Sequence, residues 1–359
     1  MSRRLRIQTL IFTLIFCTFA MAAMLYYSAN KMIVIADVAQ DSVESFGEEH
    51  EDTSVEDMSN PKGNTSGLLL QENGENTNFL CIPLPQGMKA EQVQIENHYM
   101  DKQLKIFLQD APENFFTSQA VSGNLEQVIS GSVEYAKDGI RLIFDLTDVC
   151  ECRSILENDF LYVEFVPPRE IYDKIVVIDV GHGGEDTGWE TETLQEKELT
   201  LNIAKRLKEK LDDTKIKVYY TRMDDGNPTE EARINLANAV KADMFISIHA
   251  NYDRADAKTY GTRTLYNASF FIPGFGSVEL ADILEREVVT GISGKGLGLF
   301  ASDADCYILQ NASVPAVILE VGYLSNKQEA ILLEREDYQQ RIADGIYNAI
   351  LKAYTEMEP

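Results

Sequence analysis

Three ionisable residues end apolar runs in the C-terminal half of the chain. His182 follows the run IVVIDVG, His249 follows MFISI, and Glu320 follows AVIL. The chain has only 4 histidines in 359 residues, so two of them at matching places are informative. Imidazole and carboxylate groups are the ligands that a catalytic zinc ion takes from protein, with one position left open for water. The pattern therefore predicts a metal-dependent hydrolytic site.

Glu196 is a second acidic candidate and lies between the two histidines in the sequence. Apolar residues recur at every fourth position after it and predict a helix with one apolar face: Leu199, Ile203, Leu207 and Leu211. Glu196 falls in the first turn of that helix, from which its carboxylate can point back over a sheet edge. Glu198 and Glu192 remain alternative ligands, because they lie close to the same place.

Each of these residues also has a purely structural explanation. A histidine at a strand end is often a hydrogen-bonded core residue, and Glu196 could simply favour the positive end of the helix dipole. Glu320 could pair with a buried arginine such as Arg233. Their joint placement favours a site, because the carboxyl ends of parallel strands meet at one edge, where ligands bind. A poorly solvated Glu320 would then have a raised pKa and could serve as a general base.

Acidic residues outnumber basic ones by 58 to 32, which gives a formal net charge of −26. This charge argues against binding to nucleic acid, whose phosphates would be repelled, and against charge-driven adhesion to an anionic membrane. A hydrophobic share of 45% in 359 residues is enough for two domains with sizeable cores. The five cysteines predict no disulfide framework, and the state of Cys81, Cys150 and Cys152 stays open.

Residues 1–27 predict a membrane anchor. Arg3, Arg4 and Arg6 precede an uncharged apolar stretch, residues 7–27, which as a helix is long enough to span a bilayer. The basic flank places the N-terminus in the cytoplasm and the remainder of the chain outside. A cleaved signal peptide is the alternative and would give a secreted protein.

Two segments with different residue patterns follow residue 27. Residues 28–78 predict an acidic, disordered linker, because low hydrophobicity and like charges keep a chain extended. From residue 79 to 168 apolar and polar residues alternate, as at Leu104, Ile106 and Leu108. Short alternating runs between polar turns are typical of a small antiparallel β-sandwich-like domain. Pro167 and Pro168 close it, because proline cannot continue a strand ladder.

From residue 172 to 356, strand-like apolar runs alternate with helical periodicity. We expect strands at the run before His182 and at residues 216–221, 244–249 and 317–321. We expect helices at residues 199–211, 230–241, 278–289 and 337–354. This alternation predicts an α/β domain, with a mainly parallel twisted sheet flanked by helices.

Several segments of this half resemble the zinc-dependent N-acetylmuramoyl-L-alanine amidases, the cell-wall hydrolases of the amidase-3 type. In order they are IDVGHGGEDTG, EKELTLNIAKRL, TRMDD, ARINLANAVKADMF followed by ISIHAN, and PAVILEVGYLSN. The resemblance covers about residues 174–353, and Val180 stands where the family usually has proline. By architecture and position alone, the β-rich domain resembles the AMIN-like domain that accompanies many such amidases and binds the envelope. A spacer is the alternative role.

The resemblance implies a cofactor and a set of site residues. Zinc would be bound by His182, Glu196 and His249, with Glu320 as the catalytic glutamate. We add Asn251, two residues beyond His249, and Arg233 as candidate substrate contacts. The structural alternatives are that Asn251 caps the next turn and that Arg233 supports the site from its helix.

The implied activity is hydrolysis, by zinc-activated water, of the amide bond between N-acetylmuramic acid and the L-alanine of the peptidoglycan stem peptide. A catalytically inactive cell-wall-binding scaffold and another zinc-dependent peptidoglycan peptidase are the alternatives. The expected partners are peptidoglycan and, through the N-terminal segment, the membrane; a protein activator stays open. The expected location is the outer face of the cytoplasmic membrane or the cell wall. Cell separation, wall turnover and sporulation or germination stay open as biological roles.

Overall fold

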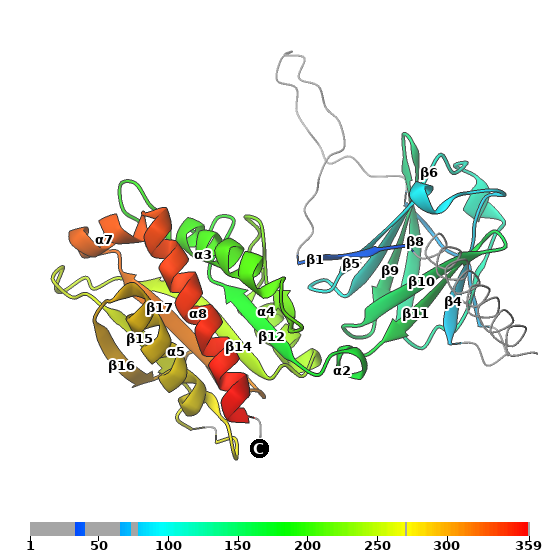
Figure 1. Cartoon of the computed structure of the whole chain (residues 1–359). Coiled ribbons are helices and arrows are strands. Elements are labelled where there is room, and N and C mark those ends of the chain that lie inside the picture. The colour runs from blue at the N-terminus through cyan, green and yellow to red at the C-terminus, as the bar shows by residue number, and fades with distance from the viewer. Residues whose placement is uncertain (1–32, 40–64, 73–77, 270, 358–359) are drawn as a thin grey trace, which may run out of the picture. The chain divides into compact units, whose positions relative to one another are not determined.

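The computed structural model describes residues 33–39, 65–72, 78–269 and 271–357 (Figure 1). The expected membrane segment, residues 1–27, lies outside these ranges, as do residues 40–64 of the acidic stretch. Within the described ranges, no helix is long and apolar enough to cross a bilayer. The chain divides into two compact units, and the division that follows the β-rich part falls between Val166 and Pro167. We call them the N-terminal and the C-terminal unit.

The N-terminal unit contains two sheets, with strand orders β1-β5-β6-β9-β8-β2 and β10-β11-β4-β7-β3. The strands are β1 (Ile35–Val38), β2 (Thr65–Gly67), β3 (Leu70–Glu72), β4 (Phe79–Pro83), β5 (Val93–His98), β6 (Gln103–Gln109), β7 (Val121–Gly123), β8 (Val128–Ala136), β9 (Gly139–Leu146), β10 (Glu151–Glu157) and β11 (Phe160–Val166). Alternate residues of β6, including Leu104 and Ile106, are fully buried. They share one core with Leu80 and Leu161 of the other sheet, so the two sheets pack face to face.

Three short strands of this unit lie inside the segment expected to be a disordered linker. β1 neighbours β5, β2 pairs antiparallel with β8, and β3 pairs parallel with β7. The prediction of a linker through residues 28–78 is therefore wrong for these strands. A short edge strand gains its hydrogen bonds from the backbone of its neighbour, so it needs no long apolar pattern of its own.

The C-terminal unit contains one sheet of order β13-β12-β14-β17-β15-β16 (Figure 1). Its strands are β12 (Ile175–Val180), β13 (Lys217–Tyr220), β14 (Met244–Asn251), β15 (Thr262–Tyr266), β16 (Gly296–Ala301) and β17 (Ala316–Tyr323). β12, β13, β14 and β17 pair in parallel, as predicted, whereas β15 runs antiparallel to β17. The carboxyl ends of β12, β14 and β17 therefore meet at one edge.

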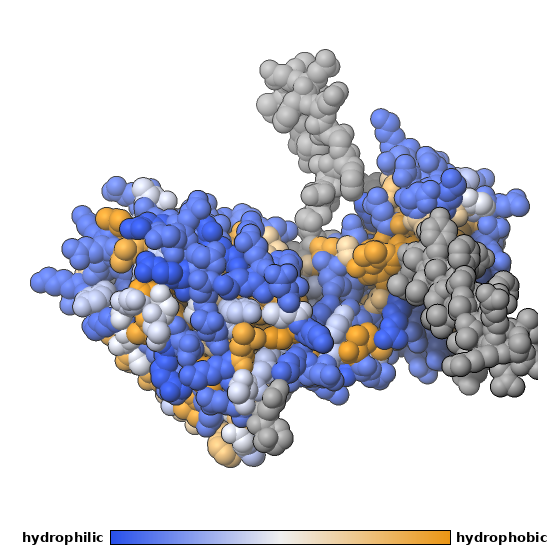
Figure 2. All heavy atoms as spheres, in the orientation of Figure 1, coloured by the Kyte–Doolittle hydropathy of each residue, from blue (hydrophilic) through white to orange (hydrophobic). Residues whose placement is uncertain are grey.

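Helices cover this sheet. They are α3 (Glu196–Leu211), α4 (Glu230–Ala239), α5 (Ser277–Ile292), α6 (Tyr307–Gln310), α7 (Lys327–Leu333) and α8 (Glu336–Met357), whereas the short helix α2 (Pro168–Ile171) lies in the segment that leads to β12. The helix α8 packs between α3 and α5 over the sheet (Figure 1). Most of the surface that this unit turns to the viewer in Figure 2 is hydrophilic. The predicted α/β fold of this unit is confirmed, and β15 and β16 are the strands that sequence patterns missed.

The apolar spacing and the charged residues of α3 explain why this segment forms a helix. Leu199, Ile203, Leu207 and Leu211 are buried and lie on one face, as their spacing predicts. Glu196 and Glu198 stand in the first turn, and Lys208 and Lys210 in the last turn. These charges complement the helix dipole at both ends. The helix start, where Glu196 lies, is therefore well defined.

Two glycines let α5 and α8 approach closely. A Cβ atom on Gly345 of α8 would lie 2.7 Å from the Cα atom of Val288 in α5. A Cβ atom on Gly291 of α5 would lie 2.9 Å from the carbonyl oxygen of Arg341. Both obstacles are backbone atoms, so no side-chain rotation can relieve the contact.

We predict that Gly345→Ala destabilises the C-terminal unit, although alanine favours a helix over glycine by about 1 kcal/mol. The new methyl group must push two helices apart, and overpacking of this kind costs about 1–3 kcal/mol. Thermal unfolding of the full chain, followed by the fluorescence of its single tryptophan, Trp189, measures the effect. Asn348→Ala at an exposed position of α8 is the matched control. A gain of stability in Gly345→Ala would contradict the prediction.

Candidate functional site

The segment after β12 turns sharply and presents His182. The backbone of His182 lies in the left-handed region, with φ 63°, and Gly183 follows with φ 137°. A Cβ atom on Gly183 would meet the carbonyl oxygen of Gly226 at 1.9 Å, so only glycine fits. The Nδ1 atom of His182 lies 2.8 Å from Oδ2 of Asp186. This contact fixes the ring and leaves Nε2 free to face the site.

Glu196 is the first residue of α3, and it is fully buried. Its Oε1 atom accepts a hydrogen bond from the backbone N–H of Ala250 (2.8 Å), and its Oε2 atom accepts one from Trp189 (2.9 Å). Burial alone would raise the pKa of this carboxyl group. His182 and His249 outweigh burial and hold the pKa well below its ordinary value. Glu196 is therefore an ionised carboxylate in a fixed orientation.

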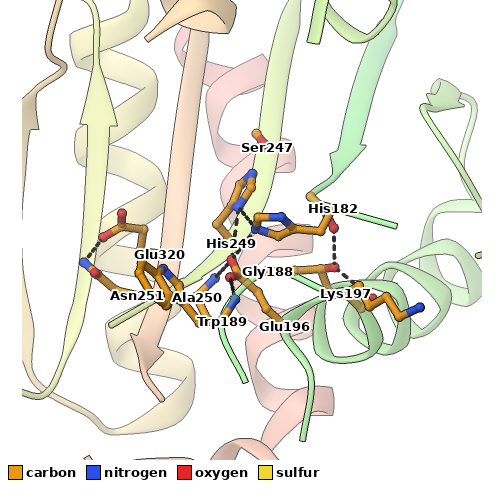
Figure 3. A network of polar contacts seen from close by, with 12 residues as sticks. His182, Gly188, Trp189, Glu196, Lys197, Ser247, His249, Ala250, Asn251 and Glu320 are labelled. Carbon is orange, nitrogen blue, oxygen red and sulfur yellow. Dashed lines mark hydrogen bonds and ion pairs between the residues drawn. The ribbon is translucent and has the colours of Figure 1, made fainter. Parts of the chain in front are cut away.

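His249 lies on β14 with its ring against the backbone of Gly181, where any Cβ atom would come within 2.4 Å of its Cε1 atom. Its Nδ1 atom lies 3.2 Å from Nε2 of His182 and 3.1 Å from Oε1 of Glu196. The third distance, from His182 Nε2 to Glu196 Oε1, is 3.1 Å. Figure 3 shows the three side chains converging. Burial acts to lower the pKa of His182, but hydrogen bonds from its ring to the carboxylates of Glu196 and Asp186 raise the pKa overall.

These three side chains could hold a metal ion, and within the described ranges they form the one such group of histidine, cysteine and acidic residues. The structure thus brings together the three residues predicted as ligands, from β12, α3 and β14. Glu198 and Glu192, the alternatives to Glu196, are exposed to solvent. The helical turn explains the difference, because Glu196 is on the face toward the sheet and Glu198 is not.

Glu320 lies on β17 in register with His249 on the neighbouring strand. Its Oε2 atom accepts hydrogen bonds from Asn251 Nδ2 and Arg263 Nε, and Arg263 Nη2 lies 3.2 Å from its Oε1 atom. Burial raises the pKa of Glu320 above its ordinary value, although Arg263 acts in the opposite direction. Figure 3 shows the contact with Asn251. Glu320 is therefore a poorly solvated carboxyl group beside the three candidate ligands.

Arg233 has the supporting role that was the alternative to a substrate contact, and it pairs with Asp179, not with Glu320. Its side chain is buried, with 4% of its surface exposed. All its N–H groups donate inside the protein, to Asp179 Oδ1, Asn227 Oδ1 and the carbonyl oxygens of Pro228, Val180 and His182. Arg233 therefore supports the turn that carries His182.

Asn251 has the turn-capping role that was the alternative, since its Oδ1 atom accepts from the N–H of Tyr252 at 2.7 Å. Its amide nitrogen donates to Glu320, a contact that sequence reasoning did not anticipate. Sequence reasoning also missed Arg263 and Asp186. The alternation in TRTLY, residues 262–266, is the signal that could have placed Arg263 on a strand. The four described cysteines, Cys81, Cys150, Cys152 and Cys306, form no disulfide.

Comparison with known proteins identifies the C-terminal unit. Residues 176–352 match the N-acetylmuramoyl-L-alanine amidase family. The chain is 34% identical over 186 residues to YqiI of Bacillus subtilis (strain 168), described as uncharacterized; the match spans 52% of this chain and 87% of that protein. It is 32% identical over 199 residues to the germination-specific N-acetylmuramoyl-L-alanine amidase of the same organism, across 51% of this chain and 81% of that protein.

Among solved structures, the catalytic domain of CwlV, an N-acetylmuramoyl-L-alanine amidase from Bacillus (Paenibacillus) polymyxa var. colistinus, is similar at 32% identity and a TM-score of 0.47. That match covers 52% of this chain and 99% of the solved domain. The family match, residues 176–352, falls in the half of the chain that carries His182, Glu196, His249 and Glu320. Through its C-terminal unit, the chain belongs to the N-acetylmuramoyl-L-alanine amidase family.

Proposed function

We propose that this protein hydrolyses the amide bond between N-acetylmuramic acid and the L-alanine of the stem peptide in peptidoglycan, with zinc as its cofactor. The observation that carries the proposal is the triangle of His182 Nε2, Glu196 Oε1 and His249 Nδ1, with sides of 3.1–3.2 Å. The family match supplies the bond that is cut.

The donor set suits zinc. Two imidazole nitrogens and one carboxylate oxygen are a known ligand set for a catalytic zinc ion. Zinc bonds of about 2.0–2.1 Å at tetrahedral angles place ligand atoms roughly 3.3 Å apart, close to the triangle observed here. His182, Glu196 and His249 would hold the ion, and Asp186 would keep the His182 ring oriented. Bound zinc would supply Lewis acidity, which favours deprotonation of water and charge on the scissile carbonyl oxygen.

Glu320 is the proton carrier in this proposal. Its Oε2 atom already accepts two hydrogen bonds, from Arg263 and Asn251, whereas Oε1 accepts one. The Oε1 atom therefore has a lone pair available to take a proton from the attacking water. The raised pKa of Glu320 brings its proton affinity nearer to neutral pH, which suits a group that accepts a proton and later returns it.

Hydrolysis of the amide bond proceeds in two steps. The water oxygen forms a bond to the carbonyl carbon of the lactyl group while its proton moves to Glu320. The bond from that carbon to the alanine nitrogen then breaks, and Glu320 returns the proton to the leaving amine. The new carboxyl group of muramic acid then loses the second proton of the water, which the amine takes up, so the products are a carboxylate and a peptide with a free, protonated N-terminal alanine.

The location remains a proposal from sequence. The apolar stretch of residues 7–27, preceded by basic residues, supports an extracytoplasmic position next to peptidoglycan, either anchored or secreted. The two-sheet N-terminal unit is in the position of an envelope-binding domain of the AMIN-like kind, and its face-to-face packing supports that comparison by architecture alone.

We predict one zinc ion per chain and a loss of affinity when a ligand is changed. Replacement of Asp186 by asparagine should weaken zinc binding about 10–100-fold, as is usual for partners of a metal-bound histidine. Glu196→Gln should weaken it more, because it removes a charged ligand. Glu198→Gln is the matched control two residues along the same helix. Isothermal titration with zinc measures these affinities, and equal effects at positions 196 and 198 would contradict the assignment.

We predict that the purified protein releases peptides with a new N-terminal alanine from peptidoglycan. Glu320→Gln should lower the rate at least about 100-fold, because general acid–base catalysis commonly contributes 10²–10⁴-fold. Mass spectrometry of the products and N-terminal labelling measure this. Binding to peptidoglycan without cleavage would support an inactive scaffold, and cleavage within the peptide would indicate a peptidase.

We predict a pH effect for Arg263→Gln. The reaction needs ionised Glu320, so kcat/KM falls as pH drops through the pKa of this group. The positive charge of Arg263 lowers that pKa, and its removal should raise the pKa and move the acid limb to higher pH. Arg263→Lys keeps the charge and should move the limb less. A limb that stays in place in Arg263→Gln would rule out Glu320 as the titrating base.

A further inference from the structure

Arg254 stands apart from the other arginines within the described ranges. It lies in the loop after β14, three residues beyond Asn251, and it is exposed. Its guanidinium carbon lies 5.0 Å from the ring centroid of Trp189. Every other arginine in the described part of the chain donates a hydrogen bond or forms an ion pair, whereas Arg254 makes this ring contact alone. The chain has a net charge of −26, yet Arg254 pairs with none of the described acidic side chains.

The two aromatic residues beside Arg254 are connected to the candidate site by hydrogen bonds of their backbone. Trp189 and Tyr252 stack with their centroids 4.9 Å apart and an interplanar angle of 22°. The backbone N–H of Trp189 donates to Glu196, which Figure 3 shows. The backbone N–H of Tyr252 donates to Asn251, which in turn donates to Glu320. We call Trp189, Tyr252 and Arg254 the aromatic–arginine cluster.

The acidic residue next to Arg254 does not neutralise it. Asp253 accepts hydrogen bonds on Oδ1 from the N–H groups of Ala255 (2.8 Å) and Asp256 (3.0 Å). Its Oδ2 atom accepts from the hydroxyl of Thr259 at 2.7 Å. These bonds hold the loop and leave the guanidinium edge of Arg254 toward solvent. A guanidinium on an aromatic face keeps its planar set of N–H donors, which matches a carboxylate in a bidentate arrangement.

We propose that Arg254 binds a carboxylate on the peptide part of the substrate and thereby determines specificity. This inference rests on the proposed function. In the bond that is cut, the carboxyl group of muramic acid is already an amide, so the carboxylates near this bond belong to the peptide. The cluster is bonded directly to Glu196 and Asn251, so a ligand on Arg254 lies beside the reaction site. A peptide carboxylate would give Arg254 the acidic partner that it lacks among the described residues.

The test uses two muramoyl peptides that differ only in a carboxylate or a carboxamide on the second peptide residue. The unsubstituted full-length protein, loaded with zinc, should show a kcat/KM ratio of about 10 or more in favour of the carboxylate, since hydrogen bonds to charged groups are worth about that factor. Arg254→Gln should reduce this ratio to roughly one, through KM of the carboxylate peptide. Arg286→Gln is the control, because Arg286 is exposed on α5 and pairs with Asp282.

A second readout does not need catalysis. Trp189 is the single tryptophan of the chain, so its fluorescence reports on this cluster directly. In Glu320→Gln, titration with the carboxylate peptide should change the emission, and the additional change Arg254→Gln should weaken that binding about tenfold. Equal kcat/KM values for the two peptides in the unsubstituted protein, or an unchanged ratio in Arg254→Gln, would overturn the inference and leave the proposed function intact. Failure to hydrolyse either peptide would overturn the proposed function and the inference with it.

Discussion

The buried side chain of Arg233 holds the turn on which the candidate site depends. It pairs with the fully buried Asp179 and also binds the carbonyl oxygens of Val180 and His182. Burial acts to raise the pKa of Asp179, but Arg233, the hydroxyl hydrogen bonds from Ser247 and Thr221, and His249 together hold it below its ordinary value. Such a pair contributes little net stability, yet loss of one partner costs about 3–5 kcal/mol because a charge stays buried and unpaired. Its role here is to keep His182 in a left-handed conformation that few residues adopt.

Glu196 connects this turn to the rest of the site. One of its oxygens faces both imidazoles and Ala250, and the other accepts from Trp189. The same carboxylate therefore orders the candidate metal site and fixes the start of the loop that carries the exposed tryptophan. A change at Glu196 would affect both the candidate metal ligands and the aromatic–arginine cluster, whereas a change at Arg254 would affect the cluster alone.

Buried Glu196 and half-buried Glu320 have opposite environments at this sheet edge. Two imidazoles keep the pKa of Glu196 low, and burial raises the pKa of Glu320 despite its arginine. Groups whose pKa values are pushed apart in this way commonly divide their roles in a reaction. Glu196 stays ionised and suits a ligand, whereas Glu320 can exchange a proton. The antiparallel strand β15 places Arg263 opposite Glu320, and this arginine limits the rise in pKa that burial causes.

The sequence by itself determined the α/β order of the C-terminal unit and the residues His182, Glu196, His249 and Glu320. Apolar runs and apolar residues at every fourth position are local patterns that the sequence shows directly. The carboxyl ends of parallel strands meet at one edge of the sheet, irrespective of the loop conformations. Only the tertiary structure decided between Glu196 and Glu198, assigned Arg233 to Asp179, and placed Arg263 and Arg254. The choice of partner for a long charged side chain depends on which distant segments pack nearby, and no spacing in the chain encodes that. The short strands β1 to β3 were missed for the same reason, since their hydrogen bonds come from neighbouring strands.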